Sequence, residues 1–433
     1  MAMHIEHTLL LPDLAAQYVQ ASHSVSLRLL AYALQAFPSP EPFQPTDTRT
    51  TGENINIMRL WADMLVARGE NAAAANVQKD VALWCHKLAQ ETAAAAALVQ
   101  SHCLLLENIP TTEALENTRG LARLLEKTPD APEKYEAQLL LAECFLDCGD
   151  IEASKQLRIA AVTACSSLRL ESALLTAKTY LAEDLTEQAI YLLDDLKANI
   201  NIFPDIEGAR VALGFFRLKM EIDQGNLAAA LTEVEDLIAL TKASGLLLQE
   251  ALACATRTEI DAQLMRDDEV IKHGIHALEL TDQLNLGETR RVGVKAVLAR
   301  ALARLGRPAK GIDYCEEIAT WAHEHKDLEL EQEFTVLAAD LAARDLQGIR
   351  AAGFYGCAAD LYNNQPLLRA RYLRKCAVQL VSSAGEDRQK TIAWAMSLLR
   401  EAGELLQGLE RDGEVAGELS AWEFDRLWIR TRR

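Results

Sequence analysis

A self-similar pattern that recurs about every 40 residues, on the scale of structural repeats, is the feature that most constrains this chain. Each copy has a small residue, a large apolar residue three positions later, a turn after seven or eight positions, and a second small residue at position twelve. The clearest copy is Ala142, Phe145, Gly149-Asp150 and Ser154. Self-similarity on this scale is typical of a solenoid. The second small residue recurs at steps of 40, 40, 35, 41, 44 and 37, at Ala74, Ala114, Ser154, Ala189, Ala230, Gly274 and Gly311.

The sequence between these turns predicts helices and no strands. Apolar residues recur at three- and four-residue spacing, as along one face of a helix. Alanine and leucine, both strong helix formers, are abundant, while the 433 residues contain only 21 glycines and 11 prolines. Two antiparallel helices joined by a tight turn cannot bury their apolar stripes alone, so neighbouring pairs must stack. We therefore predict an all-α fold.

The arrangement of small, large, Gly-Asp and small residues resembles the tetratricopeptide repeat. The resemblance implies a right-handed α–α superhelix of antiparallel helix pairs, in which the first helix of each pair lines a concave groove. Three departures stand out. The family repeat is shorter, at about 34 residues. The consensus proline is missing, and Leu218 and Glu221 replace the small and large residues of one copy. Longer helices would explain the longer period.

Composition divides the chain into four segments. Residues 1–37 predict an N-terminal helix, and 38–54 predict a loop because four prolines fall between Pro38 and Pro45. Residues 55–325 hold seven repeats. Residues 326–433 predict degenerate repeats and C-terminal capping helices.

The sequence lacks the motifs of known catalytic and cofactor sites. It has no Gly-rich phosphate loop and no Gly-x-Ser-x-Gly elbow. Cys144 and Cys148 share a helical face, and His273 and His276 could approach each other, but zinc needs more ligands than either pair supplies. We therefore expect no enzyme activity, no cofactor and no metal.

The formal net charge of −19 argues against nucleic acid and against anionic membranes as partners, because both attract basic surfaces. The first residues have no cationic region ahead of a long apolar run, unlike a secretory signal. No stretch approaches the roughly 18 apolar residues of a membrane-spanning helix. We expect a cytoplasmic protein whose nine cysteines are small apolar side chains without a disulfide framework.

If the first helix of each pair lines a groove, its inward residues can be indexed from the small residue that marks that helix. This indexing predicts a basic ladder flanked by apolar contacts, suited to an acidic peptide or a C-terminal carboxylate. Asparagines that would complete the family's carboxylate clamp are missing. The alternative is a solvated helix face of alternating charge. The predicted peptide-binding residues are Lys178, Lys219, Arg300, Arg304, Leu174, Phe215 and Gln263.

The end of the chain differs from the rest. Residues 369–433 hold 12 basic and 10 acidic residues, whereas the preceding part carries about −21. Two interpretations remain open: a final helix that caps the last repeat, or an exposed aromatic docking patch. Both rest on Trp422, Phe424, Leu427 and Trp428.

These observations predict a protein-interaction scaffold or adaptor that binds a peptide or protein segment in its concave groove. The alternative is a regulatory or sensory solenoid acting on a transcription factor or an ATPase. The sequence leaves the partner, the pathway and the oligomeric state open.

Overall fold

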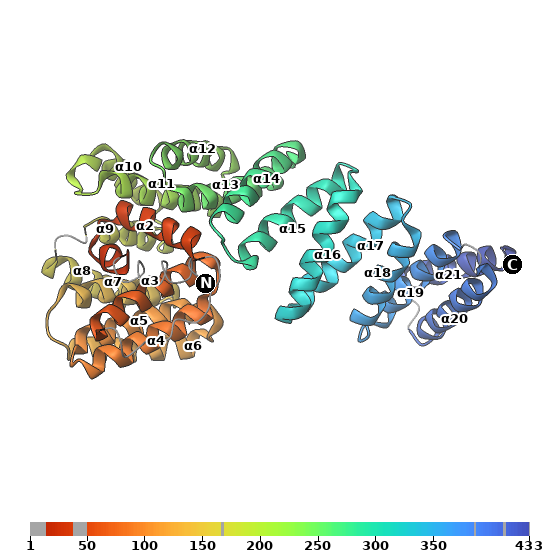
Figure 1. Ribbon diagram of the computed structural model, residues 1–433, viewed down its shortest axis with the longest axis horizontal. Helices are drawn as coiled ribbons and strands as arrows, with labels where there is room; N and C mark the ends of the chain where they lie inside the picture. Colours follow the sequence, from red (N-terminus) through yellow and green to blue (C-terminus); the bar gives the residue numbers. More distant parts are fainter. Residues whose placement is uncertain (1–13, 38–49, 166–168, 385–386, 410–412, 433) are drawn as a thin grey trace, which may run out of the picture. The chain divides into compact units, whose positions relative to one another are not determined.

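The computed structural model describes residues 14–37, 50–165, 169–384, 387–409 and 413–432. Within these ranges the chain is α-helical with short 3-10 turns and contains no strand. The prediction of an all-α solenoid of antiparallel, tetratricopeptide-like helix pairs is confirmed (Figure 1). None of the described helices is both long enough and apolar enough to span a membrane.

Contacts divide the chain into two units. Unit 1 comprises residues 1–260 and 279–290, and unit 2 comprises residues 261–278 and 291–433. The helices that lie wholly within unit 1 are α2 (His23–Ala36), α3 (Thr51–Arg68), α4 (Asn71–Lys87), α5 (Glu91–Leu105), α6 (Thr111–Glu126), α7 (Pro132–Asp147), α8 (Ile151–Ala164), α9 (Arg169–Ala182), α10 (Thr186–Ala198), α11 (Ile206–Asp223) and α12 (Leu227–Ala243).

The remaining helices belong to unit 2 or lie at its boundary. The boundary helices are α13 (Leu247–Gln263), α14 (Asp267–Gln283) and α15 (Glu288–Arg304). Unit 2 continues with α16 (Pro308–His325), α17 (Leu328–Arg344), α18 (Gly348–Leu361), α19 (Pro366–Ser382), α20 (Arg388–Gln407) and α21 (Gly413–Thr431).

Two predicted boundaries differ from the structure. The N-terminal helix is interrupted, since residues 14–20 are helical and α2 begins at His23 after an extended Ser22. Helix α3 begins at Thr51, inside the range 38–54 that we expected to be loop, because Thr50 and Glu53 form a reciprocal capping box. The proline-rich part of that predicted loop lies outside the described residues.

The long repeat period follows from the helices and turns. Many helices contain 17 residues, among them α4, α12, α13, α14, α15 and α17. Each is followed by a tight turn, and one turn residue often adopts the left-handed conformation. Gly149 does so at φ 84°, but non-glycine residues do so at Ala89, Met265, Lys326 and Leu346. Two such helices with their turns make a repeat of about 40 residues, as in the longer helical repeat families.

Small residues let successive helices pack closely. The second small residue of every predicted copy, from Ala74 to Gly311, is buried. Ala142, a first small residue, is 0% exposed and packs against Leu139, Leu146, Ala161 and Leu175. In unit 2 a continuous apolar core extends from Val292 to Ile429.

The packing of Ala142 generates a stability prediction. Ala142→Leu should lower the free energy of unfolding by about 1–3 kcal/mol, because the added carbons overpack a close helix crossing. Chemical denaturation measures this change. Ala229→Leu makes the same substitution at an exposed position of α12 and should change stability by less than about 0.5 kcal/mol. Equal effects of the two variants would contradict the proposed repeat register.

Candidate functional site

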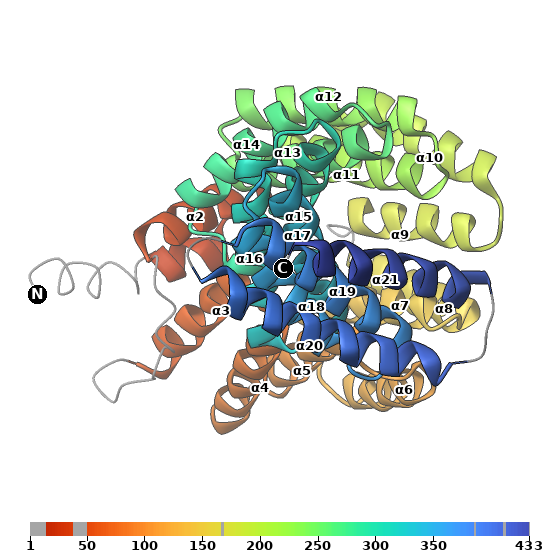
Figure 2. The same ribbon diagram turned by 90° about the vertical axis from the view of Figure 1, so that its right-hand side faces the viewer.

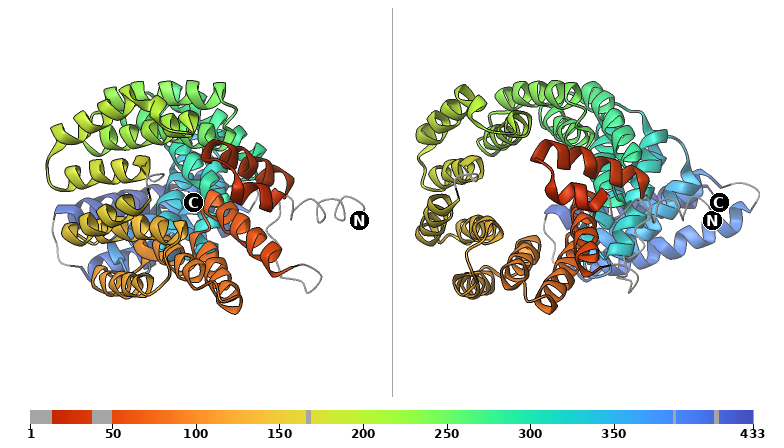
Figure 3. Two further views of the ribbon diagram at one scale, coloured as in Figure 1. Left: turned by 90° about the vertical axis from the view of Figure 1, so that its left-hand side faces the viewer. Right: turned by 60° about the vertical axis from the view of Figure 1, so that its left-hand side comes forward.

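The N-terminal segment lies on the inner side of unit 1. Helices α3 to α12 follow one another around an arc, and residues 14–36 lie inside it (Figure 3). The Tyr18 hydroxyl donates a 2.8 Å hydrogen bond to Asp63 Oδ2 on α3. Asp63 directly follows Ala62, the marker residue of its repeat. This contact identifies a side chain on the first helix of a pair that faces the interior of the arc.

The same segment also contacts the opposite end of the arc. The Ser24 backbone N–H donates a 2.6 Å hydrogen bond to Asp205 Oδ2, and Asp205 also caps α11 through the Gly208 N–H at 2.9 Å. Arg28 pairs with Glu207 and donates from Nε to the Ser244 carbonyl at 3.2 Å. The segment therefore bridges α3 and the region of α11 and α12, which lie far apart in the sequence.

A buried arginine joins three distant parts of unit 1. Arg68, only 2% exposed, donates from Nε to the Asn285 carbonyl at 3.3 Å and from Nη2 to the Phe37 carbonyl at 2.7 Å. Asn285 in turn donates from Nδ2 to the Leu34 carbonyl at 3.3 Å. Gly287 allows the close approach, because a Cβ there would lie 3.2 Å from the Arg68 carbonyl oxygen. The turn after α14 therefore lies beside the end of α3, the first helix of the arc.

An open pocket of about 510 Å³ remains beside Tyr18. Its walls carry several ionisable side chains from α3 and α7, including Arg59, Asp63, Glu133 and Glu136. Glu136 is an exposed residue, but the surrounding protein partly desolvates its carboxyl, and this effect together with the negative charges of Glu133 and Glu171 raises its pKa. Burial also raises the pKa of Asp63, although the Tyr18 hydrogen bond acts in the opposite direction. The pocket is thus lined by three carboxyl groups together with the guanidinium of Arg59.

The predicted ligand residues in unit 1 have different environments. Lys178 Nζ lies 2.9 Å from Glu143 Oε1 and 2.7 Å from Asp147 Oδ1, so carboxylates of the preceding repeat already hold it. Lys219 is exposed and forms no salt bridge with any residue of the described ranges. Leu174 packs against the core around Leu193, and Phe215 is half-buried.

In unit 2, the other predicted residues also lie in ion pairs or at the surface. Arg300 Nε lies 2.8 Å from Glu333 Oε1, and its guanidinium lies over the Phe334 ring. Arg304 Nη2 lies 2.6 Å from Asp267 Oδ1, and Gln263 is exposed. The role of these residues in peptide binding stays a prediction.

The final helix α21 has features of both a capping helix and an exposed apolar patch. Trp422 is buried and donates from Nε1 to the Leu399 carbonyl at 2.6 Å, which holds α21 on α20. Figure 2 shows these two helices side by side. Phe424 and Leu427 are instead 68% and 62% exposed. The helix packs on the last pair and still presents apolar side chains to solvent.

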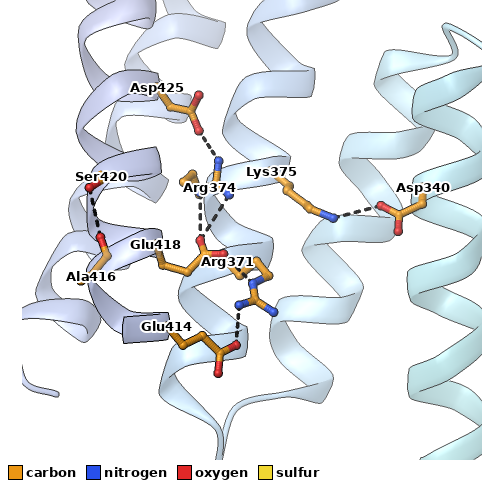
Figure 4. A network of polar contacts seen from close by, with 9 residues as sticks. All are labelled: Asp340, Arg371, Arg374, Lys375, Glu414, Ala416, Glu418, Ser420 and Asp425. Carbon is orange, nitrogen blue, oxygen red and sulfur yellow. Dashed lines mark hydrogen bonds and ion pairs between the residues drawn. The ribbon is translucent and has the colours of Figure 1, made fainter. Parts of the chain in front are cut away.

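Ion pairs hold α21 against α19 (Figure 4). Arg371 lies 2.8 Å from Glu414 and 2.6 Å from Glu418, and Arg374 lies 2.5 Å from Asp425. The acidic side chains of α21 on this side are thus used in packing. Lys375 continues the series with a 3.0 Å pair to Asp340 on α17.

The cysteine and histidine candidates are engaged elsewhere. Cys144 faces Cys103 with 3.2 Å between the sulfur atoms, and this thiol contact together with burial raises the pKa of Cys144. His273 Nδ1 lies 2.8 Å from Asp261 Oδ2. Over the described residues, no group of three or more histidine, cysteine, aspartate or glutamate side chains is arranged to hold a metal ion.

Several contact residues were not predicted from the sequence. Arg68 precedes Gly69, and the neighbouring sequence indicates only a basic residue at the end of a helix. Nothing near it indicates partners 31 and 217 residues away. For Asp205 a local signal existed, since an aspartate before a helix is a typical cap, but its second contact with Ser24 spans 181 residues.

No protein-family model matches this sequence. No curated protein matches it either. Among solved structures, a signal transduction ATPase with numerous domains and a tetratricopeptide repeat sensor from Pyrococcus horikoshii is similar over 90% of this chain, at 14% identity and a TM-score of 0.49. This chain spans 64% of that ATPase.

Two further structures are more distant. The tetratricopeptide repeat domain of P58(IPK) is 15% identical, with 100% of both chains covered and a TM-score of 0.23. Yeast Tom70 is 15% identical over 98% of this chain and 90% of its own, with a TM-score of 0.24. Such likenesses concern fold alone, and the assignment of a solenoid rests on the helix order and burial described above.

The carboxylates of the pocket generate a pH prediction. Because the pKa of Glu136 is raised in the folded state, this group costs no stability below its ordinary pKa of 4.5, and it destabilises the fold increasingly as the pH rises from there through the raised pKa. Glu136→Gln should therefore raise the melting temperature at neutral pH and have no such effect below pH 4.5. Thermal denaturation at both pH values measures the difference.

The control is Glu126→Gln at an exposed position of α6, which should not change the melting temperature at either pH. An equal stabilisation by Glu136→Gln at both pH values would show that the charge of this carboxylate is not the cause.

Proposed function

We propose that this chain is a protein-interaction scaffold and that the inner side of the unit 1 arc binds a segment of a partner protein. One observation carries the proposal: this surface already holds a helical segment, residues 14–36 of the same chain. The surface that faces the interior comes from the first helices of the repeats, as the resemblance to tetratricopeptide repeats implies.

The contacts with that segment favour recognition of a helix in general. A helix leaves backbone N–H groups free at its start and carbonyl groups free near its end. Asp205 accepts from the Ser24 N–H, whereas Asn285 and Arg68 donate to the carbonyls of Leu34 and Phe37. These contacts use backbone atoms at both ends of α2. Another helix of similar length would offer the same groups, so a partner need not share the sequence of α2.

Space and charge beside the segment would accept side chains of a partner. The 510 Å³ pocket next to Tyr18 offers carboxylates to donors or cations. Further along the arc, Lys219 is available for an acidic side chain, and we retain Lys178, Leu174 and Phe215 as proposed contacts. For unit 2, Arg300, Arg304 and Gln263 remain proposed contacts.

The alternative of a regulatory solenoid is supported by the same segment. A partner that binds where residues 14–36 lie must share the surface with them or displace them. Displacement would couple binding to the position of the N-terminal segment. Under this alternative, the chain regulates an effector protein such as a transcription factor or an ATPase.

Site-specific photo-crosslinking tests the scaffold proposal. A benzoylphenylalanine residue replaces Gln100, which lines the pocket beside Tyr18, and the full chain is irradiated in extract of its source cells. We expect a defined protein adduct from this position, identified by mass spectrometry. The control places the same group at exposed Glu116 on α6, which should yield no such adduct. Adducts from the control position alone, or none from Gln100, would contradict binding inside the arc.

A further inference from the structure

A second surface with the character of a binding site lies in unit 2, between α20 and α21. It is a groove of about 330 Å³. Met396, the buried Leu399 and the buried indole of Trp422 line its base beside Gly403. A Cβ at Gly403 would lie 2.6 Å from the Trp422 ring. The glycine therefore lets the indole rest directly on the backbone of α20.

The walls of this groove are basic. Arg400 comes from α20, and Arg426 and Arg430 come from α21, while Glu404 adds a carboxylate. Across the described part of the chain, none of these arginines forms a salt bridge. The guanidinium of Arg426 lies over the Trp422 ring, 5.1 Å from its centre.

The two sides of α21 carry opposite charge. Toward α19, Glu414, Glu418 and Asp425 are neutralised by arginines (Figure 4). Toward the groove, Arg426 and Arg430 have no such partners among the residues that the structure describes. In a chain with a net charge of −19, arginines without ion-pair partners around one groove form an unusual surface. Arginine is also among the residues that contribute most to protein–protein binding.

We propose that this groove binds an acidic segment of a partner protein, with its carboxylates beside Arg400 and Arg430. Guanidinium groups form strong paired hydrogen bonds with carboxylates. The complementary charge would also speed association. A long polyanion such as nucleic acid is disfavoured because the rest of the chain repels it. This site is independent of the proposed site inside the unit 1 arc.

Fluorescence anisotropy of a labelled synthetic peptide tests the proposal on the full chain. The probe is a short run of glutamates around a central Leu-Trp pair, and a matched peptide carries glutamine in place of glutamate. We expect the acidic peptide to bind at least about tenfold more tightly than its glutamine counterpart, and we expect 1 M salt to weaken it because exposed charges are screened within about 3 Å there.

Charge reversal locates the site. Arg400→Glu with Arg430→Glu should weaken the acidic peptide at least about tenfold, since like charges then face each other across the groove. Within the described ranges these two arginines form no hydrogen bond or ion pair with their side chains, and circular dichroism checks that the fold is kept. The control, Lys79→Glu with Arg123→Glu, makes the same change in net charge at exposed positions of unit 1 and should leave binding unchanged. Glu404→Gln should tighten binding.

Three results would overturn the proposal. They are unchanged binding in the groove variant, equal loss in the control variant, and tighter binding of a single-stranded oligonucleotide than of the peptide at this groove. None of them bears on crosslinking from Gln100, so failure here and failure of the scaffold proposal are separate outcomes.

Discussion

The guanidinium group of Arg68 is the point on which the architecture of unit 1 depends. It bonds to the carbonyls of Phe37 and Asn285, which belong to the end of the N-terminal segment and to the turn after α14. Hydrogen bonds from a charged donor contribute about 1.5–3 kcal/mol each. The burial that makes them effective also lowers the pKa of Arg68. A substitution here would remove both of these hydrogen bonds.

The repeats explain why such a junction can form. Small residues at the helix crossings let each pair stack closely on the next, and turns with a left-handed residue reverse the chain between helices. A solenoid curves by a fixed small rotation per repeat, so the first helix and a later turn can meet. Gly287 at that meeting point permits an approach that a larger residue would hinder.

The fold could be predicted from the sequence because its determinants are local. Ala142, Phe145 and Gly149 specify a crossing, a filled gap and a turn within a short stretch of chain. The turns at Ala89, Met265 and Leu346 were harder to recognise. Their backbones adopt the left-handed conformation, which residues other than glycine rarely do. The candidate site could be predicted only in part. Asp63 lies on a first helix, but its partner Tyr18 lies in a segment whose position depends on contacts 181 to 251 residues away.

The same limit applies to charge. The sequence shows that Lys178, Arg300 and Arg304 recur on the first helices of their repeats, but it does not show the carboxylates that face them from neighbouring helices. Pairing across repeats is a property of the stacked structure. In contrast, Arg400 and Arg430 have no such partners within the described segments, and their spacing gave no signal because they lie on different helices.

Hydrogen–deuterium exchange of α2 tests the central claim, that unit 1 holds its N-terminal segment inside the arc. In the unmodified full chain we predict that amides of α2 are protected to a similar degree as those of α3, because a helix of 14 residues is marginal in water without packing. Arg68→Met should remove much of that protection from α2 while α7 keeps its own. Exchange of α2 at the rate of an unstructured peptide in the unmodified chain would contradict the account.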